Sequence, residues 1–540
     1  MKLLQLLCLT TIVATPGLYA MDDQKLGEQK DQQTVENAGL FAMLPTELLS
    51  RIADIAKTCC CPKCDCGCCG DPVLDWKDIN NTQSTCKFLR KYFINTDRDI
   101  EADFSQKRLD SESVQAFLDR VLVYMLKFNL NPHKNPVTLI LSNNSLSADE
   151  PALAKFFKNI DTFGLSARII DLQLSNNGLT VLPDNINSFK NLESLDLTDN
   201  LLSSNEVEKI CVLKNLESLN IASNGLPAIP ETIGSLEKIE ELILRGNNLT
   251  ALPDSIGSLR KLSYIDLSWN QLPSNEINKV CTISSLEALN IEANPITELP
   301  EELGSMQKLT ELNIDVMQLP MAEIAKICQI SQLEDLTLLN YILPTLPNEI
   351  SNLKKLKSLT IGLNVHEFED VDPFPTMQGS ELTKLYNLKE LTSLSINNLQ
   401  ISSLPDDIIK FQKLTGLYLW GNNLSADEFS KVCQLRNLEH LSFSANNLDT
   451  IPAAIENLKK LQDLTLSFNN LPAAEIAKLS TLTNLEALSI GSNNLGSLPA
   501  ELAQLQHLKT LDITGNLIDD QDENYALLIS QLPADLQIIV

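Results

Sequence analysis

The chain has 540 residues, of which 44% are apolar, so it is long enough to bury a substantial core. Its formal net charge is -28 at pH 7, and no block of lysine and arginine offsets the acidic residues. A surface this acidic repels nucleic acid and anionic membranes, so we expect neither as a partner. After the N-terminus no apolar run approaches the ~20 residues of a membrane-spanning helix, so we expect no membrane span.

Residues 1–20 have the pattern of a cleaved export signal. Lys2 gives a positive start, residues 3–13 form an apolar run, and residues 18–20 resemble a small-residue cleavage site. We therefore expect a signal peptide over 1–20 and an exported or secreted protein. Residues 21–42 are mostly polar and are expected to form a disordered linker.

Residues 43–94 contain two short helical patterns. Pro45 is suited to the start of a helix on which Leu48 continues an apolar face. The second pattern contains the element C-K-F-L-R at 86–90. Together they resemble the F-box, the small helical module that docks onto the Skp1 adaptor of cullin ubiquitin ligases. The resemblance implies that Leu44, Pro45 and Leu48 face Skp1. The alternative is that this segment is only a helical cap over the repeats that follow.

A Cys-rich insertion at 59–69 interrupts the F-box-like pattern. Cys61 and Cys64 have the C-x-x-C spacing of half a zinc site. A second half at the usual separation is missing, because the next cysteines follow at once. We therefore consider a compact zinc cluster, disulfides in an oxidising compartment, acylated cysteines, or an exposed loop without a partner. The candidate zinc ligands are Cys61, Cys64, Cys66, Cys68 and Cys69.

Residues 95–136 are expected to be a helical linker that caps the repeats. We predict a helix from about Asp99 to Leu130, because apolar residues recur there every three or four positions. The predicted apolar stripe consists of Val114, Phe117, Leu118, Val121, Leu122 and Met125.

Residues 137–540 repeat the pattern L-x-x-L-x-L-x-x-N-x-L with a period of about two dozen residues. One copy places leucines at 192, 195, 197 and 202 and asparagine at 200. The pattern resembles that of the leucine-rich repeat family. The resemblance implies an α/β solenoid with parallel strands on its concave face, helical and extended turns on its convex face, and a small helical domain before it. Because no single repeat buries its own apolar face, the repeats must stack.

Two kinds of repeat alternate along this region. One continues with L-P-x-x-I-x-x-L, as at 252–259, and is expected to be extended on the convex side. The other continues with a helical stretch that ends in cysteine, as at 275–281. Its cysteines, Cys211, Cys281, Cys328 and Cys433, are expected to be small buried side chains. Met317, Tyr341 and Leu399 replace the repeat asparagine, so the array is expected to be imperfect near its middle.

Large side chains stand out among the non-leucine positions of the predicted strands, because most of these positions are small or polar. Exposed aromatic residues and arginine are the usual energetic anchors of protein interfaces. Two clusters are therefore candidate partner-binding sites. The first contains Ile243, Arg245, Tyr264 and Trp269, and the second contains Tyr418, Trp420, His440 and Phe468.

The sequence indicates a binding protein, because none of the four histidines lies in an H-E-x-x-H motif and no G-x-S-x-G or P-loop motif occurs. We expect no enzyme. An F-box-like segment before the repeats resembles the layout of F-box/LRR ubiquitin-ligase adaptors. Together with an export signal, that layout implies a bacterial effector that acts in the host-cell cytoplasm. The alternatives are a secreted recognition or adhesion protein with a helical cap, and a thiol or zinc module on a scaffold.

Overall fold

The computed structural model of the chain describes residues 93–95, 100–107, 113–129, 136–363, 376–519 and 523–540. The predicted signal peptide, the linker 21–42 and the insertion 59–69 lie outside the described residues, and so do almost all of the F-box-like residues 43–94. Several predicted site residues are therefore not described either, namely Leu44, Pro45, Leu48, Cys61, Cys64, Cys66, Cys68 and Cys69.

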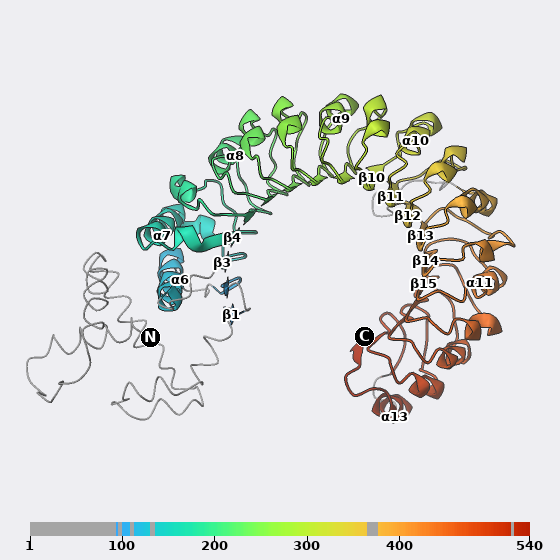
Figure 1. Cartoon of the computed structure of the whole chain (residues 1–540). Helices are drawn as coiled ribbons and strands as arrows, with labels where there is room; N and C mark the ends of the chain where they lie inside the picture. The colour runs from blue at the N-terminus through green and yellow to red at the C-terminus, as the bar shows by residue number, and fades with distance from the viewer. Residues whose placement is uncertain (1–92, 96–99, 108–112, 130–135, 364–375, 520–522) are drawn as a thin grey trace, which may run out of the picture. The chain divides into compact units, whose positions relative to one another are not determined.

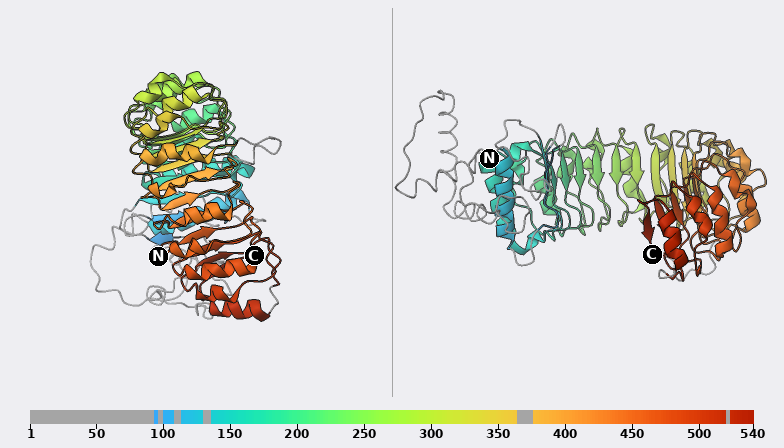
Figure 2. Two further views of the ribbon diagram at one scale, coloured as in Figure 1. Left: turned by 90° about the vertical axis from the view of Figure 1, so that its right-hand side faces the viewer. Right: turned by 90° about the horizontal axis from the view of Figure 1, so that it is seen from below.

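The chain forms two compact units, which divide between Asn248 and Leu249. In each unit, taken by itself, strands line one side and helices the other (Figure 1). Figure 2 shows the strands lying side by side. The described elements of unit 1 are β1 Phe93–Asn95, β2 Ile100–Asp103, α6 Val114–Asn129, β3 Val137–Ile140, η1 Leu146–Asp149, α7 Glu150–Thr162, η2 Ser166–Arg168, β4 Ile169–Gln173, η3 Asp184–Ser188, β5 Ser194–Asp196, α8 Ser204–Ile210, β6 Ser218–Asn220, η4 Glu231–Ser235 and β7 Glu241–Ile243, where η marks a 3-10 helix.

Unit 2 repeats the same alternation of strand and helix, and its adjacent strands pair in parallel. Its described elements are η5 Asp254–Ser258, β8 Tyr264–Asp266, α9 Ser274–Cys281, β9 Ala288–Asn290, η6 Glu301–Ser305, β10 Glu311–Asp315, α10 Met321–Ile327, β11 Asp335–Leu339, η7 Asn348–Asn352, β12 Ser358–Gly362, η9 Gly379–Asn387, β13 Ser393–Asn397, η10 Ile408–Lys410, β14 Gly416–Tyr418, α11 Ala426–Val432, β15 His440–Ser442, η11 Ala453–Asn457, β16 Asp463–Thr465, α12 Ala473–Ile476, η12 Ala477–Thr481, β17 Ala487–Ser489, η13 Ala500–Gln504, β18 Thr510–Asp512, α13 Glu523–Gln531 and β19 Gln537–Ile539.

The segment before the first repeat differs from the predicted continuous helix. Residues 100–103 form strand β2, which pairs in parallel with β3 and antiparallel with β1. The physical reason is a period of two, since Ala102 and Phe104 are both fully buried. The helix begins only at Val114. Its predicted apolar stripe is confirmed, because all six side chains predicted for it, the first at Val114 and the last at Met125, are buried.

The leucine frame of the repeats is confirmed throughout the described array. In the copy at β15, Leu438, Leu441, Phe443 and Leu448 are each at most 2% exposed. The alternation of two repeat types is confirmed as well, but the L-P segments are not extended. Each winds into a short 3-10 helix, as where Ile256 N donates to Pro253 O at 3.1 Å. Proline fixes φ for such a turn, and five residues are too few for a stable α-helix.

The repeat asparagine forms a bridge between successive repeats. Asn422 donates from Nδ2 to the carbonyl oxygens of Ile396, Leu419 and Trp420 at 2.8–3.3 Å. Its Oδ1 accepts from the backbone N–H groups of Leu399 and Ile401. One buried amide therefore satisfies backbone groups in two repeats, which could not otherwise be buried without a large cost.

Strand length does not simply follow this asparagine, because β4 has five residues although its repeat carries the bridging Asn177. Met317, Tyr341 and Leu399 occupy its position near the middle of the array, and strands β10, β11 and β13 there have five residues. Strands β14 to β18, whose repeats carry the asparagine, have three residues each. The pairing just after the strand is the same in both kinds of repeat, since Val316 N donates to Leu339 O at 2.9 Å and Gly421 N, directly before Asn422, donates to Ser444 O at 3.0 Å.

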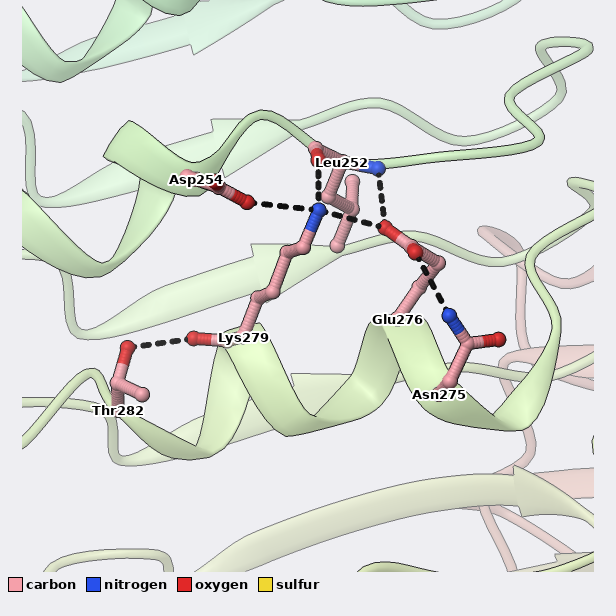
Figure 3. A network of polar contacts seen from close by, with 6 residues as sticks. All are labelled: Leu252, Asp254, Asn275, Glu276, Lys279 and Thr282. Atoms are coloured by element: carbon pink, nitrogen blue, oxygen red, sulfur yellow. Dashed lines mark hydrogen bonds and ion pairs between the residues drawn. The ribbon is translucent and has the colours of Figure 1, made fainter.

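A second bridge joins the two repeat types on the helical side (Figure 3). Glu276 Oε2 accepts from Leu252 N at 2.8 Å, and Lys279 Nζ donates to Leu252 O at 2.7 Å. Lys279 also pairs with Asp254 at 2.9 Å, and this contact raises its pKa. The same Glu-x-x-Lys bridge recurs in other repeats. Each glutamate accepts from the backbone N–H of the residue that precedes a proline in the repeat before it. These glutamates are Glu206, Glu323, Glu381, Glu428 and Glu475. The sequence analysis missed this bridge, although the glutamate lies 24 residues after the backbone N–H group that it binds in every bridge except that of Glu381, where the spacing is 35.

We predict that Asn422→Ala lowers the free energy of unfolding by roughly 2–5 kcal/mol, because it leaves buried backbone donors and acceptors without partners. Asn423→Ala is the matched control, since the Asn423 side chain is exposed. Chemical denaturation followed by circular dichroism measures both variants. Equal stabilities of the two variants would show that the asparagine bridge is not the stabilising element.

Candidate functional site

The strand side of unit 2 carries the second predicted cluster on three consecutive strands. In β14 and the two residues after it, Leu417 and Leu419 are buried in the core, while Tyr418 and Trp420 alternate with them and remain half-buried. The register places Gly416 beside His440 of β15, and His440 beside Asp463 of β16. Phe468 follows β16 in the same repeat. Tyr418, Trp420, His440, Asp463 and Phe468 are called the β14–β16 surface below.

Tyr418 lies against a glycine of its own strand. A Cβ atom on Gly416 would lie only 3.2 Å from Tyr418 Cε2 and 3.4 Å from its hydroxyl oxygen. The absence of a side chain at 416 therefore gives the tyrosine ring its space. Burial, and then the negative charge of Asp463, raise the pKa of the Tyr418 hydroxyl. The hydroxyl therefore stays protonated at neutral pH and can donate a hydrogen bond.

His440 contacts an acidic residue that the sequence analysis did not select. Its Nδ1 meets Oδ2 of Asp463, and the two side chains are 39% and 45% exposed. Asp463 occupies the position directly before the buried leucine of its strand, 23 residues after His440. That spacing was the available signal, because residues one repeat apart become neighbours in the sheet.

Phe468 has an unusual backbone conformation for a large residue. It is 63% exposed and has a φ of 57°. The residue before the repeat asparagine takes this left-handed conformation in most repeats, where it is usually small or polar, as at Ser223, Ala445, Ser492 and Gly515. A side chain costs about 1–2 kcal/mol in this conformation. The conformation itself belongs to the repeat turn, and Phe468 differs from most equivalent residues in the size of its exposed ring.

The first predicted cluster is divided between the two units. Ile243 is half-buried on β7 and Arg245 is exposed after it, both in unit 1. Tyr264 is half-buried on β8, and Trp269 is 44% exposed with a φ of 57°, both in unit 2. Trp269 thus shares the left-handed position of Phe468. That the four residues form one binding surface stays a prediction.

The repeat cysteines are core residues in the described structure. Cys211, Cys328 and Cys433 are buried and Cys281 is half-buried, and all four thiols are free. Burial raises the pKa of Cys328 and of Cys433 to about 12, so these thiols stay protonated and unreactive at neutral pH. Within the described ranges, no group of three or more histidine, cysteine or acidic residues is placed to hold a metal ion. No helix in those ranges is long and apolar enough to cross a membrane.

Comparison with known proteins identifies the class of fold. The model of the family described as leucine-rich repeat region matches residues 172–324 and 363–495, which is more than half of the chain. The chain therefore belongs to the leucine-rich repeat family. Such repeats are typically non-catalytic scaffolds that bind proteins.

Three individual proteins illustrate the similarity. The probable serine/threonine-protein kinase roco8 of Dictyostelium discoideum is 40% identical over 72 residues, which are 13% of this chain and 4% of that protein. A leucine-rich repeat protein of Leptospira interrogans has a TM-score of 0.47 and 27% identity, and the match covers 81% of this chain and 95% of that one. An internalin of Listeria monocytogenes has a TM-score of 0.44 and 20% identity over 68% of this chain and 94% of that one.

We predict that Phe468→Gly raises the free energy of unfolding by up to about 1 kcal/mol, because it relieves the left-handed backbone and removes little buried surface. Ala445→Gly is the matched control, since Ala445 has a φ of 51° at the same repeat position. Denaturant titration should show stabilisation in both. A clear loss of stability in Phe468→Gly would mean that its ring is a packing element and not a free surface residue.

Proposed function

We propose that the chain is a non-catalytic adaptor whose β14–β16 surface binds a target protein. The observation that carries the proposal is the gathering of three large aromatic side chains, Tyr418, Trp420 and Phe468, on the strand side. The leucine core does not require them there, because the frame points them away from it. Aromatic residues that are partly exposed on a rigid surface are typical anchors of protein interfaces.

We further propose that the F-box-like residues 43–94 recruit Skp1 and its cullin ligase in a host cell. The proposal rests on the sequence: the leucine and proline at 44–45, the C-K-F-L-R element at 86–90, and the position before the repeats. The export signal at 1–20 would deliver the protein out of the producing cell. Leu44, Pro45 and Leu48 would form the apolar contact with Skp1.

One observation favours a different role for the N-terminal segment. Phe93–Asn95, at the end of the F-box-like residues, form β1 and pair with β2 of the sheet. A segment that ends inside the sheet fits a cap as well as an F-box. The second candidate is therefore a secreted recognition or adhesion protein that uses the same β14–β16 surface and has no ligase partner.

Two pairs of substitutions separate these functions. Leu44→Ala with Pro45→Ala should abolish Skp1 capture and leave the target bound, since both residues lie outside the repeats. Tyr418→Ala with Trp420→Ala should weaken target binding by ~2 kcal/mol or more and leave Skp1 bound. The target is first identified by cross-linking through a photoreactive residue at position 468. Binding of each double variant to purified Skp1 and to this target is then measured by affinity capture.

The control for the cross-link is a photoreactive residue at Val212, which is 53% exposed and follows α8. A target that labels equally from 212 and 468 would contradict recognition by the strand side. Absence of Skp1 binding by the wild-type protein at micromolar concentration would reject the ligase adaptor and leave the secreted recognition protein.

We also propose that the insertion 59–69 binds zinc through Cys61 and Cys64 and some of Cys66, Cys68 and Cys69, because thiolates are strong zinc ligands. Elemental analysis of the purified, reduced protein should find about one zinc per chain. Cys61→Ser with Cys64→Ser should lose it, and the control Cys281→Ser should keep it. A metal-free wild-type protein would reject the zinc cluster, and thiol titration would then distinguish disulfides from free cysteines.

A further inference from the structure

Acidic side chains surround the aromatic residues of the β14–β16 surface. Asp463 and Asp512 lie on the strand side itself, on β16 and β18. Glu439 and Glu486 line a hollow of about 420 Å³ at the edge where β15–β17 begin, together with Lys460, Gln462, Asn484 and His507. Lys509, which precedes β18, is paired with Glu486 at 2.5 Å, so its charge is already compensated.

Asp463 is placed to accept a further partner. His440 contacts its Oδ2, and among the described residues no hydrogen bond reaches its Oδ1. Its carboxylate is 45% exposed, so a side chain from outside can approach it. Its charge also acts on the Tyr418 hydroxyl, which shows that the tyrosine and the carboxylate share one electrostatic environment.

The aromatic rings complete a site for a cation. Tyr418 and Asp463 stand on strands separated by β15, and Tyr418 lies two residues beyond the position level with Asp463, so their backbones are roughly 12 Å apart. His440 of β15 lies between them and contacts Asp463, so a guanidinium or ammonium group would approach this row of side chains from outside. The faces of tyrosine and tryptophan rings attract such a group, and a nearby carboxylate strengthens the attraction.

We propose that the β14–β16 surface binds a positively charged segment of its protein partner, with one arginine or lysine side chain held by Tyr418 and Asp463. Charge complementarity supports this occupant, because the chain carries a net charge of -28 and the carboxylate of Asp463 is partly exposed on this surface. The inference rests on the proposed function, since it names the chemistry of the partner that this surface would bind.

Gly416 has a positioning part in this site. It is the residue that leaves space for the Tyr418 ring, and a Cβ there would press on both the ring and its hydroxyl. Gly416→Ala therefore displaces an aromatic face without changing any charge. It tests whether geometry, beyond the general negative charge, determines binding.

The test is fluorescence anisotropy of the full-length protein with a labelled peptide of alternating arginine and glycine, and with the same peptide carrying glutamate for arginine. The wild type should bind the arginine peptide and not the glutamate peptide, more weakly as salt is raised. Asp463→Asn and Tyr418→Ala should each raise Kd by about tenfold, and Gly416→Ala by about threefold.

Asp335→Asn is the matched control. Asp335 begins β11 at the position equivalent to Asp463 in β16, so its substitution removes the same charge at a different place. It should change Kd by less than about twofold. Equal weakening by Asp335→Asn and Asp463→Asn would overturn the proposal, since it would mean diffuse attraction. Absence of arginine-peptide binding would also overturn it. If Tyr418→Ala with Trp420→Ala still abolished target capture, the proposed function would stand and only the cationic chemistry would fail.

Discussion

The bridge made by the repeat asparagine is the interaction on which the other features of this chain depend. A chain that turns sharply every two dozen residues must bury carbonyl and N–H groups that no strand or helix can pair. One asparagine amide has the two donors and two acceptor lone pairs needed to bind groups of its own repeat and of its neighbours. Asn200 in unit 1 and Asn446 in unit 2 donate to the equivalent carbonyl groups, and each accepts from a backbone N–H of the preceding repeat. The repeats can therefore stack with a nearly constant register.

The same turn prepares the positions that face a partner. The residue before the repeat asparagine takes the left-handed conformation, and in most repeats that residue is small or polar. Phe468 and Trp269 depart from this rule and project large rings outward at the end of a strand. On the opposite side the Glu-x-x-Lys bridges join a repeat to the one before it, as Figure 3 shows for Glu276 and Lys279. A scaffold held from both sides keeps its surface side chains in place, which lowers the cost of binding.

Much of this could be predicted from single residues and their spacing. The leucine frame, the amphipathic helix at 114–129 and the buried cysteines each follow from a local period. The prediction failed where local pattern competes with pairing. Residues 100–103 form a strand because they pair in parallel with β3, although the local pattern predicts a helix there. Likewise the L-P segments become 3-10 helices of five residues, with the proline directly before the first turn.

The sequence by itself determined that this is a stacked leucine-rich repeat protein, because periodic burial of leucine and asparagine has no other compact solution. It also indicated Tyr418, Trp420, His440 and Phe468, since large side chains are rare at strand-side positions. Only the tertiary structure decided which residues become their neighbours. Asp463 meets His440, and Gly416 makes space for Tyr418, through the register of β14, β15 and β16. Register depends on how whole repeats stack, so no single repeat contains the information.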